Sequence, residues 1–577
     1  MPPPSAWDAA IAAVFLFFLQ ASLVPAFQLN PRPALQTTHR NRGEYTRQYN
    51  SGGPQIPFLN QIGQLDARTL ERISDAAFDT FEDAYLHFRR EFESPKDRKL
   101  RLLQMDLNRK KKRRIVVLGF GWAGHAISKI IDTDNTEVIF VSPRNYFLFT
   151  PMLASSAVGT VEYRSITEPV RKANPAAEYY EGTCIDVFPE SQEILVQSST
   201  SQKSGRSETV RIPYDALVWA VGTQTGTFGV PGVREHAFFL KEIEDSTALR
   251  AAIVDTLELA SLPGLPEEEV KKLLTFAVVG AGPTGVEFTG ELLDFIKNDL
   301  PNYYPRLVGK IQVKLIQGGD SILPVFDKAL REKGMTTLLE NNANLEILLS
   351  TQVKEVKANT LVFSDFKSNS KNTLSFGGQK TLDYGVCVWA AGTEPRPITR
   401  SLLSKLPNQD EKRGKVATDQ WLRVKGTNGT IFALGDCSYI DGAPLPETGQ
   451  VAAQQGAFIA RQLNRNYDMS QDKPKFIREK SGSTFGEELS DYIRLRGNIE
   501  AKPFTFLNLG LLAYIGDRKA LAQVQTGDVT WSQSYGEVGF LLWRSIYIVK
   551  QVSTRNRILV LFDRLKSRLF GRDITRL

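Results

Sequence analysis

The feature that most restricts the fold is a strand, glycine turn and helix pattern that occurs twice. It reads IVVLGFGWAGHAISKII from residue 115 and FAVVGAGPTGVEFTGELLDF from residue 276. In such a turn the first glycine permits a tight bend, the second lets a pyrophosphate approach the backbone, and the third lets the helix pack on the strand. The helix N-terminus then stabilises the negative charge. The repeat predicts an α/β fold with two Rossmann-type dinucleotide-binding domains.

These glycines are Gly119, Gly121 and Gly124 in the first repeat and Gly280, Gly282 and Gly285 in the second. Two such sites in one chain favour a hydride relay, in which one dinucleotide stays bound and the other exchanges. The strand after the first repeat ends at Ser142, where an acidic residue commonly meets the ribose. The strand after the second ends at Gln317, which would not repel a 2′-phosphate as an acid would. We therefore expect NADPH to be accepted alongside NADH.

Three further apolar strands end in small residues, in the segments ALVWAVGT, GVCVWAAGTEP and IFALGDC. The last places Asp436 at a strand end beside a glycine. A carboxylate there can accept hydrogen bonds from the ribityl hydroxyls of a flavin. The alternative is a plain helix cap or turn residue.

Cysteine and histidine usage excludes several classes of site. The three cysteines, Cys184, Cys387 and Cys437, are far apart and form no CxxC, and the four histidines show no metal-ligand spacing. We predict no disulfide framework and no metal. The basic run at 109–114, RKKKRR, leads into a predicted buried strand and has no interleaved aromatic residues. It indicates a solvated strand entrance, and we predict no nucleic-acid partner.

The net charge of +7 is concentrated at the C-terminus. Residues 539–577 contain nine Lys/Arg and two Asp, which is +7 for this segment alone. Its apolar clusters alternate with Arg and Lys at helical spacing and never reach the roughly 18 uninterrupted apolar residues of a membrane span. Such helices lie in the membrane interface; a core helix pair or a dimer contact is the alternative. The candidate lipid-facing residues are Leu541, Trp543, Tyr547, Ile558, Leu559 and Phe562.

The N-terminal residues resemble targeting segments. An apolar run, AAIAAVFLFFLQASLVPAF, is followed by an Arg-rich stretch almost without acids, as in a signal followed by a transit peptide. We expect a peripheral protein of an organelle membrane, with the plastid thylakoid favoured and the mitochondrial inner membrane as the alternative. Residues 64–108 then place apolar residues at helical spacing and predict one or two amphipathic helices.

With these motifs the chain resembles the type II NAD(P)H:quinone oxidoreductases, the non-proton-pumping alternative NAD(P)H dehydrogenases. The segments that carry the resemblance, from residue 113 to the C-terminus, include LGFGWAG, SPRNYFLFTPMLASSAVGTVEYRSITEPV, VVGAGPTGVEFTGEL, VWAAGTEP, ALGDC, PETGQVAAQQG and LAYIG. The resemblance implies FAD in the first unit, NADH or NADPH as substrate in the second, and a membrane quinone as electron acceptor.

The resemblance also implies roles for single residues. For FAD it implies Gly119, Gly121, Gly124, Ser142, Pro143, Arg144, Thr150, Pro151 and Asp436. For NAD(P)H it implies Gly280, Gly282, Gly285 and Glu287. Glu287 could position the nicotinamide or relay a proton, and its alternative is a favourable interaction with the helix dipole. Gln450 and Gln454 match the quinone-site glutamines, whose neutral amides can donate a hydrogen bond in an apolar tunnel. Their alternative is to cap and pack a helix.

On this basis we divide the chain into five parts. They are a targeting leader (1–60), a helical N-terminal extension (61–112), a discontinuous FAD-binding domain (113–272 and 385–500), an NAD(P)H-binding domain (273–384) and a C-terminal membrane-anchoring domain (501–577).

Two rival functions remain at this stage. A sulfide:quinone oxidoreductase would share the fold but needs a reactive cysteine pair, for which Cys184 and Cys387 would have to serve. A non-catalytic flavoprotein of the apoptosis-inducing type is the other rival, and the intact segment GQVAAQQG argues against it. The sequence also permits a homodimer.

Overall fold

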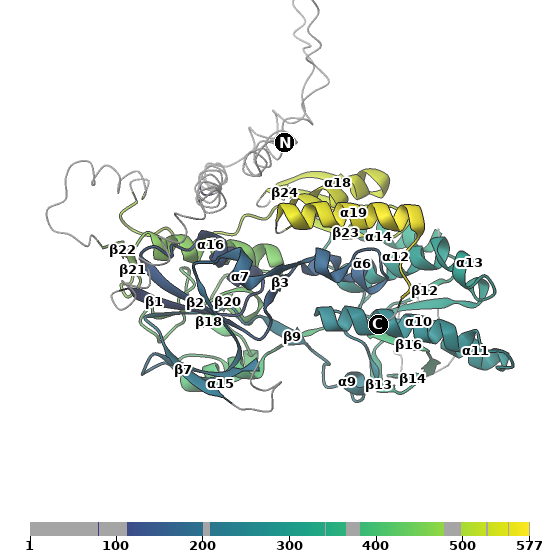
Figure 1. Cartoon of the computed structure of the whole chain (residues 1–577), viewed down its shortest axis with the longest axis horizontal. Coiled ribbons are helices and arrows are strands. Elements are labelled where there is room, and N and C mark those ends of the chain that lie inside the picture. The colour runs from purple at the N-terminus through teal and green to yellow at the C-terminus, as the bar shows by residue number, and fades with distance from the viewer. Residues whose placement is uncertain are drawn as a thin grey trace, which may run out of the picture.

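The computed structural model describes residues 112–199, 208–340, 342–364, 381–477, 498–526, 529–551 and 553–575, together with Asp79 and Leu495. The leader and, apart from Asp79, the amphipathic helices expected at 64–108 lie outside these residues. The described part contains two α/β units side by side and a C-terminal region along one edge of both (Figure 1). The expected fold with two Rossmann-type domains is confirmed.

The first unit is built on a seven-stranded sheet with the order β19-β8-β1-β2-β5-β6-β7. The first five strands of this order run parallel, and β6 and β7 add an antiparallel hairpin. The strands are β1 (Arg113–Leu118), β2 (Thr136–Ser142), β5 (Glu178–Phe188), β6 (Glu193–Ser198), β7 (Thr209–Pro213), β8 (Ala216–Trp219) and β19 (Ile431–Ala433).

Strand β1 explains why this sheet reads as continuous apolar sequence. Ile115 and Val117 belong to one buried cluster, whereas Val116 and Leu118 belong to another. A parallel strand covered on both faces needs apolar residues at every position. On one face, helices α5 (Trp122–Ile130) and α16 (Gly449–Asn464) pack against each other. Strand β1 begins at Arg113, and the Arg114 Nε is 2.8 Å from Glu137 Oε2. Residues 109–111 of the basic run lie outside the described residues, and Arg113 and Arg114 are half-buried, so the solvated strand entrance stays a prediction.

The second unit contains a parallel four-stranded sheet with the order β12-β11-β10-β16. Its strands are β10 (Thr275–Val279), β11 (Gln312–Ile316), β12 (Leu345–Leu348) and β16 (Val386–Trp389). An antiparallel sheet of β13 (Val353–Lys357), β14 (Thr360–Phe363) and β15 (Thr381–Asp383) adjoins it. Helix α12 (Pro283–Asn298) follows β10, and α14 (Lys328–Glu340) follows β11.

One expected boundary differs from this arrangement. We assigned 385–500 to the first unit, but β16 pairs in parallel with β10, with Val388 opposite Val278. The second sheet therefore extends beyond residue 384. The reason is that β16 lies beside β10 in the second sheet as β8 lies beside β1 in the first. Such a pairing between distant strands cannot be seen in the linear sequence. The units are then joined by β9 (Thr223–Thr225), which pairs with β17 (Thr393–Pro395).

The remaining strands and helices connect or flank these two sheets. The strands are β3 (Tyr146–Leu148), β4 (Thr167–Pro169), β18 (Val416–Thr418), β20 (Ser438–Ile440), β21 (Tyr467–Asp468) and β22 (Lys475–Phe476). The helices are α6 (Leu153–Ala157), α7 (Val170–Ala173), α9 (Val233–His236), α10 (Ile243–Ala260), α11 (Glu267–Leu273), α13 (Leu300–Tyr303) and α15 (Pro397–Lys405).

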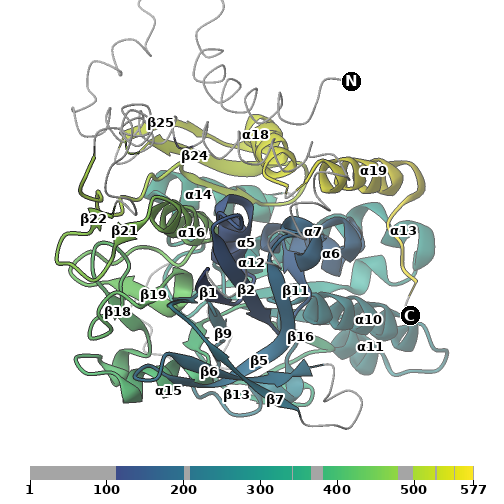
Figure 2. The ribbon, with the colours of Figure 1, turned by 60° about the vertical axis from the view of Figure 1, so that its left-hand side comes forward.

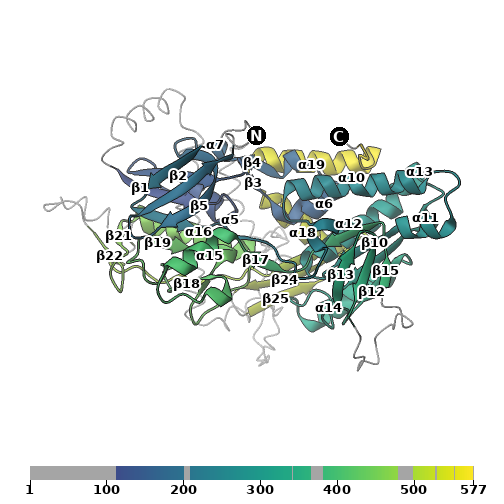
Figure 3. The same cartoon turned by 90° about the horizontal axis from the view of Figure 1, so that it is seen from below.

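The C-terminal region consists of a three-stranded antiparallel sheet and two helices. The elements are β23 (Leu511–Tyr514), β24 (Ala520–Thr526), β25 (Val529–Ser534), α18 (Gly536–Val549) and α19 (Thr554–Phe570). The two helices lie along one edge of the molecule, and α19 runs beside α6 and α10 (Figures 1 and 3). No helix in the described ranges is long and apolar enough to cross a membrane.

Candidate functional site

The first glycine turn has the backbone that the motif predicts. Gly119 has φ +94°, and a Cβ there would lie 2.3 Å from the Ala220 carbonyl oxygen. A Cβ on Gly124 would lie 2.2 Å from the Gly119 oxygen, so helix and strand are in direct contact. Gly121 instead faces open space, with nothing within 4 Å of a Cβ. Because α5 has no capping side chain and no acid in its first turn, its N–H groups are available to a phosphate.

The second turn repeats this geometry. Gly280 has φ +105°, a Cβ there would lie 2.7 Å from the Ala390 oxygen, and a Cβ on Gly285 would lie 1.8 Å from the Gly280 oxygen. Gly282 again faces open space, and α12 also begins without a capping side chain or an acid. Both turns therefore fit a pyrophosphate, which is the group common to FAD and NAD(P)H.

The first turn is covered by two other segments. Trp122, the first residue of α5, donates a hydrogen bond from Nε1 to Thr150 Oγ1 over 3.1 Å. The start of α16 lies against the same indole, because a Cβ on Gly449 would be 2.6 Å from it. Pro151 follows Thr150 in a 3₁₀ turn. The structure thus brings Thr150 to the first glycine turn, as the expected FAD site requires.

Asp436 lies in a tight turn after β19. Gly435 has φ +72°, and its N–H donates to Gln455 Oε1 on α16 over 2.7 Å. Burial raises the pKa of Asp436, and the positive charge of Lys241 opposes this shift. Lys241 itself donates to Thr223 Oγ1 over 2.9 Å. The sequence analysis did not single out Lys241 or Gln455, because neither belongs to a glycine motif.

The strand-end residues expected near the ribose of FAD form a small loop after β2. Ser142 is buried, and its Oγ accepts the Arg144 N–H over 3.2 Å. Pro143 is exposed. The Arg144 guanidinium forms an ion pair with Glu242, the N-cap residue of α10. Arg144 thereby joins this loop to α10.

Gln317 directly follows β11 and reaches the second glycine turn. Its Oε1 accepts the Ala281 N–H over 2.9 Å, and its own backbone N–H donates to the Leu348 oxygen. The amide therefore lies at the position where a ribose-binding acid is commonly found.

Glu287 faces the C-terminal region. Its Oε1 accepts the Tyr514 backbone N–H over 3.2 Å and the Trp543 Nε1–H over 3.4 Å. The residue is 7% exposed, and burial raises its pKa to about 8. Glu287 lies in the second turn of α12 and not in the first. Interaction with the dipole at the helix start therefore does not explain its position.

The position of Trp543 corrects one expectation. We expected its side chain to face lipid, but it is 2% exposed and stacks on Tyr514 with ring centroids 5.0 Å apart. Tyr547 also is partly buried and packs against Trp543. The physical reason is that a buried indole N–H needs an acceptor, and Glu287 supplies one. Amphipathic periodicity alone does not contain this information.

Gln450 and Gln454 project from the first two turns of α16. Gln454 makes a two-way contact with Leu507, donating to its oxygen over 2.8 Å and accepting its N–H over 3.0 Å. Gln450 Oε1 accepts the Leu509 N–H over 3.3 Å. The helix cap is Thr448, whose side chain accepts the Val451 N–H. The glutamines therefore hold the segment before β23 and do not cap the helix.

The cysteines do not form a reactive pair. Cys184 lies on β5 of the first unit and Cys387 on β16 of the second, in different buried clusters. Burial raises the pKa of both thiols to about 12, and a protonated thiol is a poor nucleophile. Within the described ranges, no group of three His, Cys, Asp or Glu residues could hold a metal ion.

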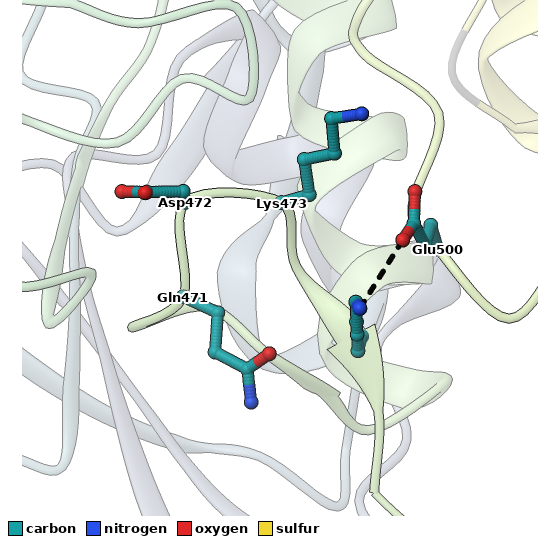
Figure 4. Close-up of a pocket in the computed structure, with 5 residues that line it drawn as sticks. Gln471, Asp472, Lys473 and Glu500 are labelled. Atoms are coloured by element: carbon teal, nitrogen blue, oxygen red, sulfur yellow. Dashed lines mark ion pairs between the residues drawn. The ribbon is translucent and has the colours of Figure 1, made fainter.

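A surface hollow lies away from these groups. It is lined by the β21–β22 connection, including Asp472 and Lys473, and by the ion pair of Lys475 with Glu500 at 3.3 Å (Figure 4). The site residues described above do not line it.

Comparison with known proteins agrees with this geometry. Residues 113–456 match the family "Pyridine nucleotide-disulphide oxidoreductase", and residues 508–573 match "NDH2 C-terminal domain". An external alternative NADH-ubiquinone oxidoreductase of Yarrowia lipolytica mitochondria is 38% identical over 81% of each chain. An external alternative NAD(P)H-ubiquinone oxidoreductase of Arabidopsis thaliana mitochondria is 32% identical over 81% of this chain and 91% of its own.

Solved structures show the same relationship. NDH2 from Plasmodium falciparum in complex with NADH has a TM-score of 0.69 and 25% identity, over 81% of this chain and all of that one. A sulfide:quinone oxidoreductase from Aquifex aeolicus, at 16% identity and a TM-score of 0.54, shares the fold alone. The family matches, the relatives and the paired glycine turns together show that the chain belongs to the type II NAD(P)H:quinone oxidoreductases, flavin-dependent enzymes that oxidise NAD(P)H and reduce a quinone.

Proposed function

We propose that this protein oxidises both NADH and NADPH and reduces ubiquinone at the surface of a mitochondrial membrane. The observation that carries the proposal is the pair of open glycine turns, at Gly121 and Gly282, in two units joined through β9 and β17. FAD, when bound, takes a hydride from NAD(P)H and supplies two electrons to a quinone. The protein supplies binding and orientation for these groups.

We assign the first turn to FAD because the chain closes around it. The α5 N-terminus would hold the pyrophosphate, and Ser142 and Asp436 lie at strand ends that would meet the ribose and the ribityl chain. Arg144, Pro143, Thr150 and Pro151 belong to the loops around this site. Burial raises the pKa of Asp436, and the nearby Lys241 acts against this rise.

Acceptance of NADPH follows from the second turn. Gln317 Oε1 is used by the Ala281 N–H, so the Nε2 donors remain for the ribose or for a 2′-phosphate. Because residue 317 is an amide and not a carboxylate, it would not repel that phosphate. Gly280, Gly282 and Gly285 would receive the pyrophosphate of either substrate.

The quinone headgroup is assigned to the neighbourhood of Gln450 and Gln454. Gln454 is occupied by Leu507, whereas Gln450 uses only its oxygen, for the Leu509 N–H. Its Nε2 has no acceptor among the described residues and can donate to a quinone carbonyl. Glu287 contacts the same C-terminal segment at Tyr514, and its raised pKa suits a group that holds a proton near neutral pH.

Membrane binding is assigned to one face of α18 and α19. Leu541, Ile558 and Phe562, three of the expected residues, are 66%, 60% and 62% exposed. Leu565 and Leu569 extend the same face of α19, with 53% and 66% exposure. A row of exposed large apolar residues on a helix favours insertion into a lipid interface. Through this face the protein would bind the membrane without spanning it.

The relatives named above are mitochondrial, which supports an organelle membrane and favours the mitochondrial alternative over the plastid. The leader on which the plastid expectation rested lies outside the described residues. A homodimer through the same helices stays a prediction that light scattering of the detergent-solubilised protein would test.

The test is quinone-dependent oxidation of NADH and of NADPH by the FAD-loaded protein in liposomes, with ubiquinone and plastoquinone analogues compared. Turnover of both donors with ubiquinone is the expected result. Turnover with plastoquinone alone would instead support a location in the plastid. Quinone reduction by sulfide without turnover of either donor would contradict the proposal.

A further inference from the structure

Where α18 and α19 meet, a buried guanidinium group has donors that lack an acceptor among the described residues. Arg564 is 8% exposed, and its Nε and Nη2 are buried without an acceptor among the residues that the structure describes. Its flat face lies over the Trp543 ring, with Cζ 4.9 Å from the centroid. Leaving buried charged donors unpaired is costly. The fold therefore provides a donor group that lacks an anion.

Further arginines surround this group. Arg544 projects from α18, and Arg568 lies one helical turn beyond Arg564 on α19. Arg518 lies in the turn between β23 and β24. Burial, followed by repulsion from Arg568 and Arg518, lowers the pKa of Arg544. The cluster thus combines several like charges, which an anion would stabilise.

A carboxylate near the cluster, on α12, is already engaged. Glu291 on α12 acts on the pKa of Arg564. However, its two oxygens accept hydrogen bonds from Ser155 Oγ at 2.6 Å and Thr160 Oγ1 at 2.9 Å, and Arg572 Nη2 lies 3.4 Å away. The Tyr514 hydroxyl, also near Arg564, donates to Asp294. These groups therefore do not complete the coordination of Arg564.

The location indicates which anion would bind. Helices α18 and α19 pack against each other along one edge of the molecule (Figure 2). The exposed apolar row from Ile558 to Leu569 lies on α19, and Arg564 and Arg568 lie on the flank of the same helix by their spacing. A molecule that presents a phosphate above acyl chains would meet both features at once.

We propose that the arginine cluster where α18 and α19 meet is a binding site for the phosphodiester headgroup of an anionic phospholipid, held by Arg564, Arg544 and Arg568. This inference rests on the proposed membrane binding and goes beyond it by assigning a defined headgroup site. Arg564 supplies a planar fork that can donate two parallel hydrogen bonds to phosphate oxygens. The bound lipid would fix the angle between the two helices, and Trp543 would transmit this constraint to Glu287 through its indole N–H.

The test compares flotation of the FAD-loaded protein with vesicles of pure phosphatidylcholine and with vesicles that also contain phosphatidylglycerol. Arg564→Gln keeps the size of the side chain and removes its charge. Arg568→Gln changes an exposed residue of the same cluster, so it tests the proposal even if the buried Arg564→Gln variant does not fold. Arg555→Gln is the matched control, because Arg555 is exposed on α19 and no carboxylate pairs with it among the described residues.

We expect Arg564→Gln to lower affinity for the phosphatidylglycerol vesicles by about tenfold, Arg568→Gln by about fivefold, and the control by no more than about twofold. Binding to pure phosphatidylcholine should stay unchanged in all variants. Equal losses in Arg555→Gln and Arg564→Gln would overturn the defined site in favour of diffuse attraction. Failure of the wild-type protein to bind either vesicle would instead overturn the membrane proposal.

A second measurement separates a lipid from a free anion. Line broadening of the ³¹P signal is followed for short-chain phosphatidylglycerol below its micelle concentration and for inorganic phosphate. Broadening by the wild-type protein that is confined to the lipid and lost in Arg564→Gln is the expected result. An equal response to inorganic phosphate would overturn the lipid assignment.

Discussion

The two glycine turns have the same backbone and different surroundings. In both, the first glycine has a positive φ and abuts a carbonyl oxygen of a neighbouring strand's end, and the second faces open space. Around the first turn, Trp122, Thr150 and the start of α16 close over the site. At the second turn, Pro283 and Thr284 at the start of α12 are exposed. The motif therefore predicts pyrophosphate binding at both turns, and the different surroundings support the proposal that the first turn retains a cofactor and the second receives an exchanging substrate.

The strongest test of this comparison places the same charge in each turn. Gly121 and Gly282 have φ −80° and −73°, which any residue adopts, so Gly121→Glu and Gly282→Glu should fold. Repulsion between the carboxylate and a pyrophosphate should weaken binding at least ~100-fold at the altered site. We expect Gly121→Glu to lose the flavin absorbance and Gly282→Glu to keep it while its KM for NADH rises.

Gly309→Glu is the matched control, because position 309 is also open and belongs to neither turn. Loss of flavin in Gly282→Glu with retention in Gly121→Glu would reverse the assignment of the two turns.

The next test concerns the strand ends. Gln317→Glu would place a carboxylate beside the second turn, where it repels a 2′-phosphate. We expect kcat/KM for NADPH to fall at least ~10-fold and that for NADH to change less than about threefold. Steady-state kinetics with both donors measure this, and NADH is the internal control. Strict use of NADH by the wild type, unchanged in the variant, would contradict the role of Gln317.

A smaller effect, on the free energy of unfolding, is expected where α12 contacts the C-terminal region through Glu287. Burial raises the pKa of Glu287 to about 8, so between pH ~4.5 and 8 the folded state holds a proton that the unfolded chain has released. The free energy of unfolding should therefore fall as pH rises through this window. Glu287→Gln removes that contribution, and at pH 8 the variant should be more stable than the wild type by ~1 kcal/mol or more.

Thermal or denaturant unfolding as a function of pH measures this difference. Glu235→Gln, at an exposed helix position, is the control and should retain the wild-type pH dependence. A parallel pH dependence in Glu287→Gln would show that another group is responsible.

The smallest effect concerns the closure of the first turn. Trp122→Phe removes the hydrogen bond to Thr150 and keeps an aromatic ring beneath α16. We expect the dissociation constant of FAD to rise about 3- to 10-fold, the range of one hydrogen bond. Thr150→Val should have a similar effect, and the double variant should be no weaker than either single one, because the two changes remove the same interaction. Additive losses would mean that each residue contacts the cofactor independently.

Both turns and both helices could be predicted from the sequence, because a glycine with positive φ and an apolar strand leave local patterns. The exposed face of α19 was also predictable, since Ile558 and Phe562 follow helical periodicity. Boundaries were harder. The strand β16 was assigned to the wrong unit, because nothing local reveals that Val388 pairs with Val278.

The sequence by itself determined the two dinucleotide-binding units, the family and the amphipathic pattern of the C-terminal helices, because each depends on local spacing. Only the tertiary structure decided what these features contact. It paired Glu287 with Trp543, which was expected in lipid, and it engaged Gln454 with Leu507. It also buried Arg564 in such a way that its Nε and Nη2 have no acceptor among the described residues. Such contacts join residues from about 50 to more than 250 positions apart, and they arise from packing, which local periodicity does not encode.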